Sequence, residues 1–231
     1  MPNSAIDELP DAWLSEDPLP NEPVSILKRW LDEAFAARLQ DSPHAVSLAT
    51  IEPDGRPAAR MVLCNAVDVE RGEFVMYTNR ESRKGRALAQ NPRGAMVFHW
   101  GPQGRSARVE GAVTLTSDEE CDAYFATRPL DAKIGAWASA QSEPIASREA
   151  MVAKVAQQAE RFGVSFDDFA SNTQSDVTIP RPPHWGGFTL HAELVELWVS
   201  RPARIHDRAQ WTRSSATAGT ASSWTSQRLQ P

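Results

Sequence analysis

The chain lacks several features that would place it in a well-marked class. Its 231 residues contain no apolar stretch approaching the roughly 20 residues that a membrane span needs. Polybasic runs are absent, and 24 Lys and Arg against 30 Asp and Glu give a net charge of −6, which disfavours general affinity for nucleic acid. The acidic, Pro-rich N-terminus does not have the basic and apolar regions of a signal peptide. We therefore expect a cytoplasmic protein that binds neither membrane nor nucleic acid.

Cysteine and glycine motifs are equally sparse. The two cysteines, Cys64 and Cys121, have no spacing that indicates a disulfide or a metal site. We expect both to be small buried apolar side chains rather than reactive thiols, and we expect no metal. No Gly-x-Gly-x-x-Gly run follows a strand pattern and no Walker A run is present, which disfavours a nicotinamide or nucleoside triphosphate fold.

What is present is a series of short alternating segments joined by turns. Alternation predicts strands, and helical spacing or capping residues predict helices. Expected strands are 44–51, 58–67, 73–78, 94–100 and 105–115, with short strands across 185–211; expected helices are 25–39, 82–92, one that starts near 118, and 145–162. Strands in hairpin-sized steps favour a mainly β (α+β) antiparallel barrel with peripheral helices over a parallel sheet.

The remaining segments set the domain organisation. Residues 1–22 hold four prolines and few apolar anchors, so we expect a flexible or loosely docked arm. Residues 23–231 then form a single domain. Within it, 163–180 is a polar loop, and the low-complexity stretch 214–223 is expected to be a flexible hairpin tip.

Two clusters of cations stand out in this acidic chain. Arg204, His206 and Arg208 alternate, so an extended strand would point all three side chains to one face. A solvent-facing strand would give the same alternation. The other group is Arg83 and Lys84, shortly after the run Tyr77-Thr78-Asn79. Two separated cation clusters indicate a site for an anionic small molecule.

Taken in order, these segments resemble the pyridoxine/pyridoxamine 5′-phosphate oxidase family. The resemblance runs from about Pro23 to Pro231 and is carried by RMVL at 60–63, YTN…SRKG at 77–85, YFxxRPxDxxIGAWxSxQS at 124–142, RPPHWGG at 181–187, RIHDR at 204–208 and the terminal RLQP. It implies a split β-barrel and an obligate homodimer with FMN bound across the subunit interface. It also implies pyridoxine biosynthesis, by oxidation of pyridoxamine or pyridoxine 5′-phosphate to pyridoxal 5′-phosphate with O2 as the acceptor.

Residue by residue, the resemblance implies contacts to FMN. Guanidinium groups bind phosphate oxygens in pairs and lysine adds a point charge, which suits the phosphate end. Hydrogen-bond donors suit a ring on which negative charge develops during reduction. The implied FMN-binding residues are Arg60, Met61, Val62, Leu63, Tyr77, Thr78, Arg83, Lys84, Ser106, Gln141, Ser142, Trp198 and Arg208. As alternatives, Trp198 is plain core and Arg208 a surface cation.

The implied substrate site is less complete. Its residues are Asn65, Tyr124, Arg128, Ala132, Arg204 and His206, with the last two as the catalytic pair that flanks the pyridine ring. Tyr124 and Arg128 are four residues apart on a helix, so both can face one phosphate. His206 has an alternative as a structural histidine in an edge strand.

Four departures from the family pattern concern this site. Asn65 stands where the family has a phosphate-binding lysine, Ala132 replaces a serine that shares this phosphate, and Ser106 replaces a glutamine that contacts the flavin. The arm also lacks an Arg-x-x-Tyr lid sequence. Losing one cation and one hydroxyl costs on the order of 2–5 kcal/mol of phosphate binding. Three hypotheses follow: a B6 phosphate oxidase, a related flavin oxidoreductase for another substrate such as an aromatic metabolite without phosphate, or a non-catalytic binder of flavin or pyridoxal phosphate.

Overall fold

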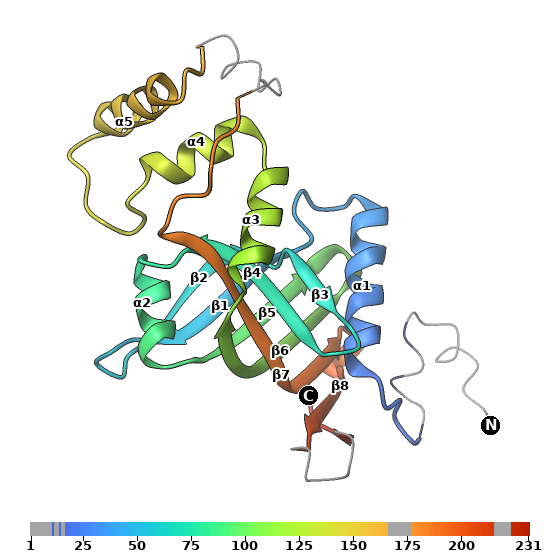
Figure 1. Ribbon diagram of the computed structural model, residues 1–231. Helices are drawn as coiled ribbons and strands as arrows, with labels where there is room; N and C mark the ends of the chain where they lie inside the picture. Colours follow the sequence, from blue (N-terminus) through green and yellow to red (C-terminus); the bar gives the residue numbers. More distant parts are fainter. Residues whose placement is uncertain (1–10, 12–13, 15–16, 166–176, 215–222) are drawn as a thin grey trace.

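A curled antiparallel sheet forms the centre of the molecule (Figure 1). The computed structural model describes residues 11, 14, 17–165, 177–214 and 223–231. Within these residues nine strands form one sheet in the order β2-β1-β5-β6-β7-β4-β3, with β8 added to β7 and β9 to β8. The strands are β1 (Ala45–Ile51), β2 (Pro57–Leu63), β3 (Ala66–Asp68), β4 (Glu73–Asn79), β5 (Arg93–Trp100), β6 (Arg105–Leu115), β7 (Trp185–Val199), β8 (Asp207–Arg213) and β9 (Trp224–Arg228).

Five helices surround this sheet in the described part of the chain. They are α1 (Pro23–Ala37), α2 (Arg83–Gln90), α3 (Asp118–Thr127), α4 (Leu130–Ala138) and α5 (Arg148–Arg161). In Figure 1, α4 and α5 extend beyond the sheet at the end opposite to β8. Among the described residues no helix has the length and hydropathy to cross a membrane. The predicted architecture, mainly β with peripheral helices, is confirmed.

Two separate apolar cores result from this arrangement. The barrel core takes the inward residues of the alternating strands, such as Val46, Leu48 and Phe98, together with Trp30 from α1. A smaller core holds α3 and α4 together through Phe125, Leu130, Ile134, Val164, Ile179 and Trp185. Because Tyr77 of β4 packs against the second core, the helical layer meets the barrel beside that strand.

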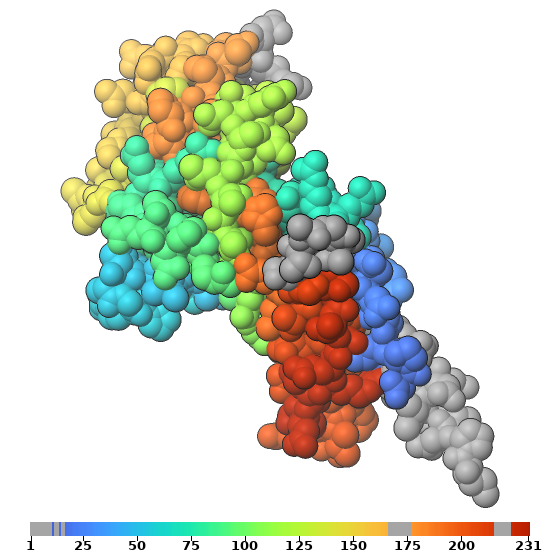
Figure 2. Space-filling model, turned by 60° about the horizontal axis from the view of Figure 1, so that its bottom comes forward, coloured from blue at the N-terminus to red at the C-terminus, as the bar shows by residue number. Residues whose placement is uncertain are grey.

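Part of the predicted N-terminal arm packs on the C-terminal strands. Leu14 is fully buried and Leu19 is 7% exposed. The Trp211 indole donates a hydrogen bond of 2.6 Å to the carbonyl of Pro20, and Arg228 donates to the carbonyl of Leu14. Figure 2 shows the blue N-terminal segment against the red C-terminal strands. These positions are therefore docked; most of 1–16 lies outside the described residues, and the division at residue 22 stays a prediction.

The predicted single strand 58–67 is wrong, because the chain changes partner within it. β2 pairs with β1, but the amide of Asn65 donates to the carbonyl of Val75 in β4 over 2.7 Å. The chain then continues as β3, which pairs with β4. Sequence alternation does not reveal this break, since both strands keep the same period of two. The break turns the side chain of Asn65 toward α3.

Three further differences concern the C-terminal half. The stretch from Trp185 to Val199 is one 15-residue strand rather than several short ones. The extended strand expected through Arg204 and His206 is wrong: residues 202–204 form a 3-10 turn with positive φ at Ala203 and Arg204, and β8 begins at Asp207. The short helix α4 was not expected as an element. The expectations for 166–176 and 215–222 fall outside the described residues.

Candidate functional site

Two adjoining cavities lie where the barrel meets the helical layer. Their volumes are about 210 Å³ and 300 Å³. They share five lining residues: Tyr77, Thr78, Arg128, Gln141 and Trp185. The first adds Met61, Val62, Leu63, Asn65, Lys84 and Tyr124; the second adds Asn79, Ala132, Gly135, Ala136 and Ser139. The structure thus brings together residues of β2, β4, α2, α3, α4 and β7.

Three parallel aromatic rings form one wall of this site. Tyr77 stacks on Tyr124 with ring centroids 4.0 Å apart and planes 7° apart. Trp185 continues the stack at 5.5 Å from Tyr77, with an interplanar angle of 4°. The rings come from β4, α3 and the start of β7. Flat apolar faces of this kind suit a planar ring system.

Arg128 adds a positive charge beside the aromatic wall. Its guanidinium carbon lies 4.9 Å from the centroid of Trp185. Its Nη1 is buried and has no hydrogen-bond partner among the described residues. Burial lowers the pKa of Arg128, with Tyr124 and Asp131 opposing this shift. A buried cation that keeps an unused donor is suited to bind an anionic group.

Lys84 provides the charge at the α2 side of the site. Its Nζ donates to Thr78 Oγ1 at 2.9 Å, Ser82 Oγ at 3.2 Å and Gln141 Oε1 at 2.5 Å. All three acceptors are neutral. Burial, followed by the charge of Arg60, lowers the pKa of Lys84 to about 8. Ser82 also caps α2, so the lysine lies at the positive end of the helix dipole.

Arg60 and Arg83 share one carboxylate, and neither lines the two cavities. Arg83 Nε donates to Glu52 Oε2 at 2.9 Å, and Arg60 Nη2 lies 3.4 Å from Glu52 Oε1. Arg60 also donates to Thr50 Oγ1 at 2.7 Å. Burial lowers the pKa of Arg60, Glu52 raises it, and the charge of Arg83 lowers it further. Three cations and one carboxylate leave this end of the site with an excess of positive charge.

Asn65 is fully engaged in the wall of the site. Its Nδ2 donates to the hydroxyl of Tyr124 at 2.8 Å, and its Oδ1 accepts from the amide of Tyr77 at 3.1 Å. It therefore adds no charge to the site and holds Tyr124 and Tyr77 in their stack. Ala132 lines the second cavity and presents only a methyl group there. The site is thus an aromatic wall with Arg128 as the cation nearest to it.

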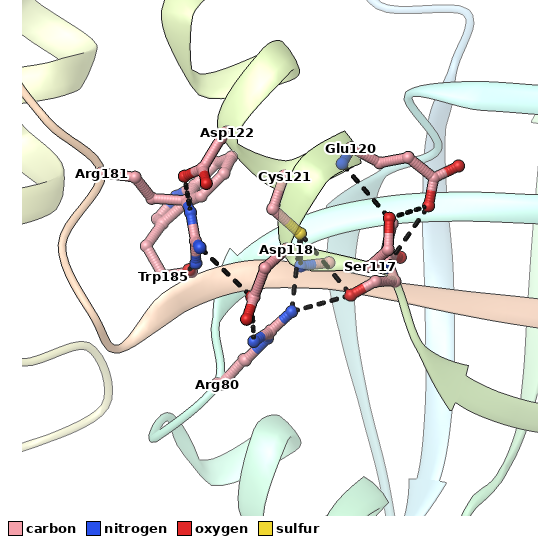
Figure 3. Close-up of polar contacts among 10 residues, drawn as sticks. Arg80, Ser117, Asp118, Glu120, Cys121, Asp122, Arg181 and Trp185 are labelled. Carbon is pink, nitrogen blue, oxygen red and sulfur yellow. Dashed lines mark hydrogen bonds and ion pairs between the residues drawn. The ribbon is translucent and has the colours of Figure 1, made fainter.

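A network of ion pairs fixes α3, which carries Tyr124 and ends at Arg128 (Figure 3). Arg181 donates to Asp122 at 2.6 Å, to Asp118 at 3.1 Å and to the carbonyl of Trp185 at 2.7 Å. Arg80, the residue directly after β4, donates to the same Asp118 at 3.2 Å. One arginine thereby joins the helix to the start of β7.

A glycine in β7 makes room for this network. A Cβ atom at Gly186 would lie only 2.2 Å from Arg80 Nε. Any larger residue would displace the Arg80 side chain, so the Gly-Gly pair after Trp185 has a steric reason. The N-terminal end of α3 has a full capping box between Ser117 and Glu120, as its sequence predicts.

A second cluster of predicted site residues lies at the other end of β7. Ser106, Trp198 and Arg208 are direct cross-strand partners on β6, β7 and β8, so their side chains share one face. The His206 ring is 4.7 Å from that of Trp198. None of these four lines the two cavities, and neither does Arg204. Trp198 is about 40 Å from Trp185 along the strand path, at roughly 3.3 Å per residue.

The ion pairs of Arg208 restrict what it can bind. Its Nε and Nη2 donate to Glu196 Oε1 at 3.0 and 2.7 Å. Burial opposes ionisation of Glu196, but Arg108 and Arg208 together hold its pKa below the ordinary value. The remaining Nη1 donates to the carbonyl of Gln230. Arg208 is therefore a fixed donor on the sheet face rather than a mobile surface cation.

Most sequence-predicted residues of the first cluster meet in one place. Trp185 lies within the RPPHWGG run but is not among the residues that the resemblance implies for the site; its aromatic type within that run is the one sequence signal for it. Ser142 does not line the cavities; it is exposed and has a φ of 75°. The donor set fits a flavin mononucleotide in kind: cations for a terminal phosphate and a flat aromatic surface for a ring. No group of three or more metal-ligating side chains occurs in the described residues.

Comparisons with known proteins indicate the family. The family model described as pyridoxamine 5′-phosphate oxidase matches residues 31–161, and the pyridoxine 5′-phosphate oxidase C-terminal dimerisation region matches residues 185–231. A pyridoxine/pyridoxamine 5′-phosphate oxidase of Burkholderia lata is 46% identical over 220 residues, covering 95% of this chain and 94% of its own. The protein of that name from Cupriavidus taiwanensis is 44% identical, with coverage of 94% and 93%.

Solved structures show the same fold. PhzG from Burkholderia lata, crystallised with tetrahydrophenazine-1-carboxylic acid, matches with a TM-score of 0.78 and 29% identity, over 97% of this chain and 98% of its own. A pyridoxamine 5′-phosphate oxidase-related, FMN-binding protein from Nostoc punctiforme matches with a TM-score of 0.67 and 16% identity, over 90% and 98%, which shows the fold alone. The names and titles of these relatives thus mention two classes of compound, B6 phosphates and a phenazine carboxylic acid.

Proposed function

Because the chain belongs to the pyridoxamine 5′-phosphate oxidase family, we propose that it is an FMN-dependent oxidoreductase with active sites built from two copies of the chain. The observation that carries the proposal is the contrast between its two residue clusters. Lys84, Arg60 and Arg83 would provide the phosphate end on one side of the fold. Trp198 and Arg208 lie at the far end of β7, outside the cavities. A twofold dimer would bring the second cluster of one copy to the first cluster of the other.

An exposed apolar surface supports this dimer. Met61 and Leu63 of β2 are 65% and 44% exposed, and Val97 of β5 is 37% exposed. Ser47 of β1 pairs with both Met61 and Val97, so these side chains share the outward face of three neighbouring strands. Met61 and Leu63 also line the first cavity. The surface that a partner would cover is therefore continuous with the site that it would complete.

The reaction we propose first is oxidation of a B6 phosphate. FMN would supply a two-electron acceptor for a carbon that bears an amine or an alcohol, with O2 reduced to H2O2. For the amine, water enters and ammonia leaves, so that the aldehyde pyridoxal 5′-phosphate forms. Arg128 and Tyr124 would hold the substrate phosphate, while Arg204 and His206 of the second copy would position the pyridine ring. The 46% identity with a named oxidase supports this assignment.

A second substrate class is favoured by Asn65 and Ala132. The side-chain amide of Asn65 is hydrogen-bonded to Tyr124 and Tyr77 and adds no charge, and Ala132 has no hydroxyl. Arg128 then lies beside the aromatic wall without a second cation at position 65. Such a site suits a planar aromatic compound with one carboxylate better than a phosphate dianion. The likeness to PhzG, which was crystallised with a tricyclic carboxylic acid, supports this alternative.

One experiment separates these functions. The protein purified without added flavin is examined for flavin absorbance, then assayed for pyridoxal 5′-phosphate and H2O2 with pyridoxamine and pyridoxine 5′-phosphate. A colourless protein that takes up no FMN in a titration contradicts the flavoprotein proposal as a whole. A yellow protein that is silent with both B6 phosphates, but whose flavin spectrum shifts with tetrahydrophenazine-1-carboxylic acid, supports the second substrate class.

A further inference from the structure

Glu52 is a buried carboxylate in the middle of the cationic end of the site. It directly follows β1 and is only 8% exposed. Its backbone is held by the turn to β2: the amide of Glu52 donates to the carbonyl of Arg56 at 2.8 Å, and its carbonyl accepts from Gly55 at 2.8 Å. The side chain therefore has little freedom to leave by movement of the backbone.

Both oxygens of this carboxylate bind a guanidinium group. Oε2 accepts from Arg83 Nε at 2.9 Å, and Oε1 lies 3.4 Å from Arg60 Nη2. Side-chain exposure is 20% for Arg60 and 9% for Glu52, so water screens this pair weakly. Lys84, in contrast, donates to three neutral oxygens and to no carboxylate in the described part of the chain. Two of the three cations are thus already paired with an internal anion.

A phosphate group would compete for the same donors. Guanidinium N–H groups bind carboxylate and phosphate oxygens with the same geometry, so one N–H cannot serve both fully. A carboxylate held near a bound dianion also repels it. Removing that carboxylate would free two arginines for phosphate. It would also leave the largely buried Arg60 without its ion pair in the cofactor-free protein, whereas the side chain of Arg83 is 58% exposed and would be hydrated.

We propose that Glu52 is an internal counterion of the cofactor phosphate site: it neutralises Arg60 and Arg83 in the cofactor-free protein and competes with the phosphate of FMN. The inference rests on the proposed FMN function. Glu52 thereby has two effects: it lowers the affinity of the site for the phosphate, and it stabilises the cofactor-free fold. No contact between Glu52 and the flavin ring is required.

The test compares Glu52→Gln with Asp54→Asn. Asp54 lies on the same turn, and its one ion-pair partner among the described residues is the exposed Arg56. Its substitution therefore removes the same charge without touching the cluster. Each cofactor-free protein is titrated with FMN and with riboflavin, which lacks the phosphate, and bound flavin is followed by its fluorescence. We expect Glu52→Gln to lower the Kd for FMN at least fivefold, to leave the Kd for riboflavin unchanged, and to lower the Tm of the cofactor-free protein. Asp54→Asn is expected to change none of these.

Other outcomes overturn the inference. Weaker FMN binding by Glu52→Gln would show that the carboxylate holds the arginines in place for the phosphate. Equal shifts for FMN and riboflavin would show an effect on the fold. If Glu52→Gln does not fold, Glu52→Asp keeps the charge but shortens its reach; tighter FMN binding is again expected, and unchanged binding contradicts the inference. Failure of the wild-type protein to bind FMN contradicts the proposed function instead.

Discussion

The side-chain amide of Asn65 donates a hydrogen bond of 2.8 Å to the hydroxyl of Tyr124. This bond joins the break between β2 and β3 to helix α3. Its other side-chain atom accepts from the amide of Tyr77, which stacks on Tyr124 at 4.0 Å. One neutral residue thus holds two of the three residues of the aromatic wall, Tyr124 by its hydroxyl and Tyr77 by its backbone amide. It does so at the position where the family resemblance implies a phosphate-binding lysine.

This relationship predicts the effect of restoring the family residues. If the substrate is a B6 phosphate, Asn65→Lys with Ala132→Ser adds a cation and a hydroxyl and lowers its KM by about tenfold or more. Steady-state kinetics with pyridoxamine 5′-phosphate measures this change. Arg128→Ala should then nearly abolish activity, because it removes the cation nearest the aromatic wall. No detectable B6 oxidation before or after the double substitution argues for a different substrate.

The second prediction concerns pH and Lys84. Burial and the charge of Arg60 lower its pKa to about 8 in the folded protein, so the amine loses its proton above that pH. A bound phosphate favours the protonated form, and FMN binding above pH 8 must therefore take up a proton. The Kd for FMN should stay level from pH 7 to 8 and then rise by up to about tenfold per pH unit. Fluorescence titrations across pH 7 to 9.5 measure it.

Lys84→Arg is the matched control for this titration. Arginine keeps its charge throughout this range, so the rise in Kd above pH 8 should disappear. The same group affects the cofactor-free fold: its folded pKa lies below its unfolded value, so unfolding takes up a proton between these two pH values. The free energy of unfolding gains a contribution as pH rises from about 8 toward the unfolded pKa. A rise in Kd that persists in Lys84→Arg would assign the pH dependence to another group.

A mixing experiment tests whether two chains share each site. Lys84→Ala impairs one cluster and Arg208→Ala the other, so each homodimer should be inactive. In mixed dimers one site carries both substitutions and the other carries neither, which restores about a quarter of the sites at equal mixing. Light scattering should give twice 25.5 kDa.

The control for mixing uses two substitutions in the same cluster. When the Lys84→Ala protein is mixed with the Arg128→Ala protein, every site in every dimer carries one substitution, so no activity should return. Recovery in this control, or a stable monomer that retains tightly bound FMN, would contradict the shared site.

Arg204 is expected to act on the substrate rather than on the cofactor. It follows a left-handed Ala203 in an exposed turn and does not line the cavities of its own chain. Arg204→Ala should therefore reduce kcat/KM far more than it reduces the flavin content per chain, which absorbance measures. An equal loss of both would assign Arg204 to folding or to cofactor retention.

Arg181 is expected to position α3. Arg181→Ala removes three hydrogen bonds that join the helix to Trp185, so Tyr124 and Arg128 should lose their fixed placement. We predict an increase of about tenfold or more in KM with little change in the Kd for FMN, because Lys84 is untouched. Arg86→Ala, which breaks an exposed pair with Glu143, is the control and should leave both unchanged. A loss of FMN binding in Arg181→Ala would assign Arg181 to the fold as a whole.

The sequence by itself determined the class of fold and the order of its elements. Period-two alternation and turn residues are local signals, and β1, β4, β5 and β6 begin and end within one residue of their predicted limits. The N-cap serine Ser82 marks the start of α2, and the polar run 116–119 marks the start of α3. Motif order identified the family, and the first cluster of predicted site residues meets in one place.

Only the tertiary structure decided which of these residues meet, because that depends on partners distant in sequence. At Asn65 the hydrogen-bonding partner of the chain changes from β1 to β4. This change alters no local sequence pattern, yet it directs the side chain of Asn65 to Tyr124. The row of Ser106, Trp198 and Arg208 arises from the strand register. The pairing of Arg60 and Arg83 with Glu52 arises because β2 and helix α2 both pack beside β1. Local propensity fixes elements, whereas register and packing fix which side chains share a site.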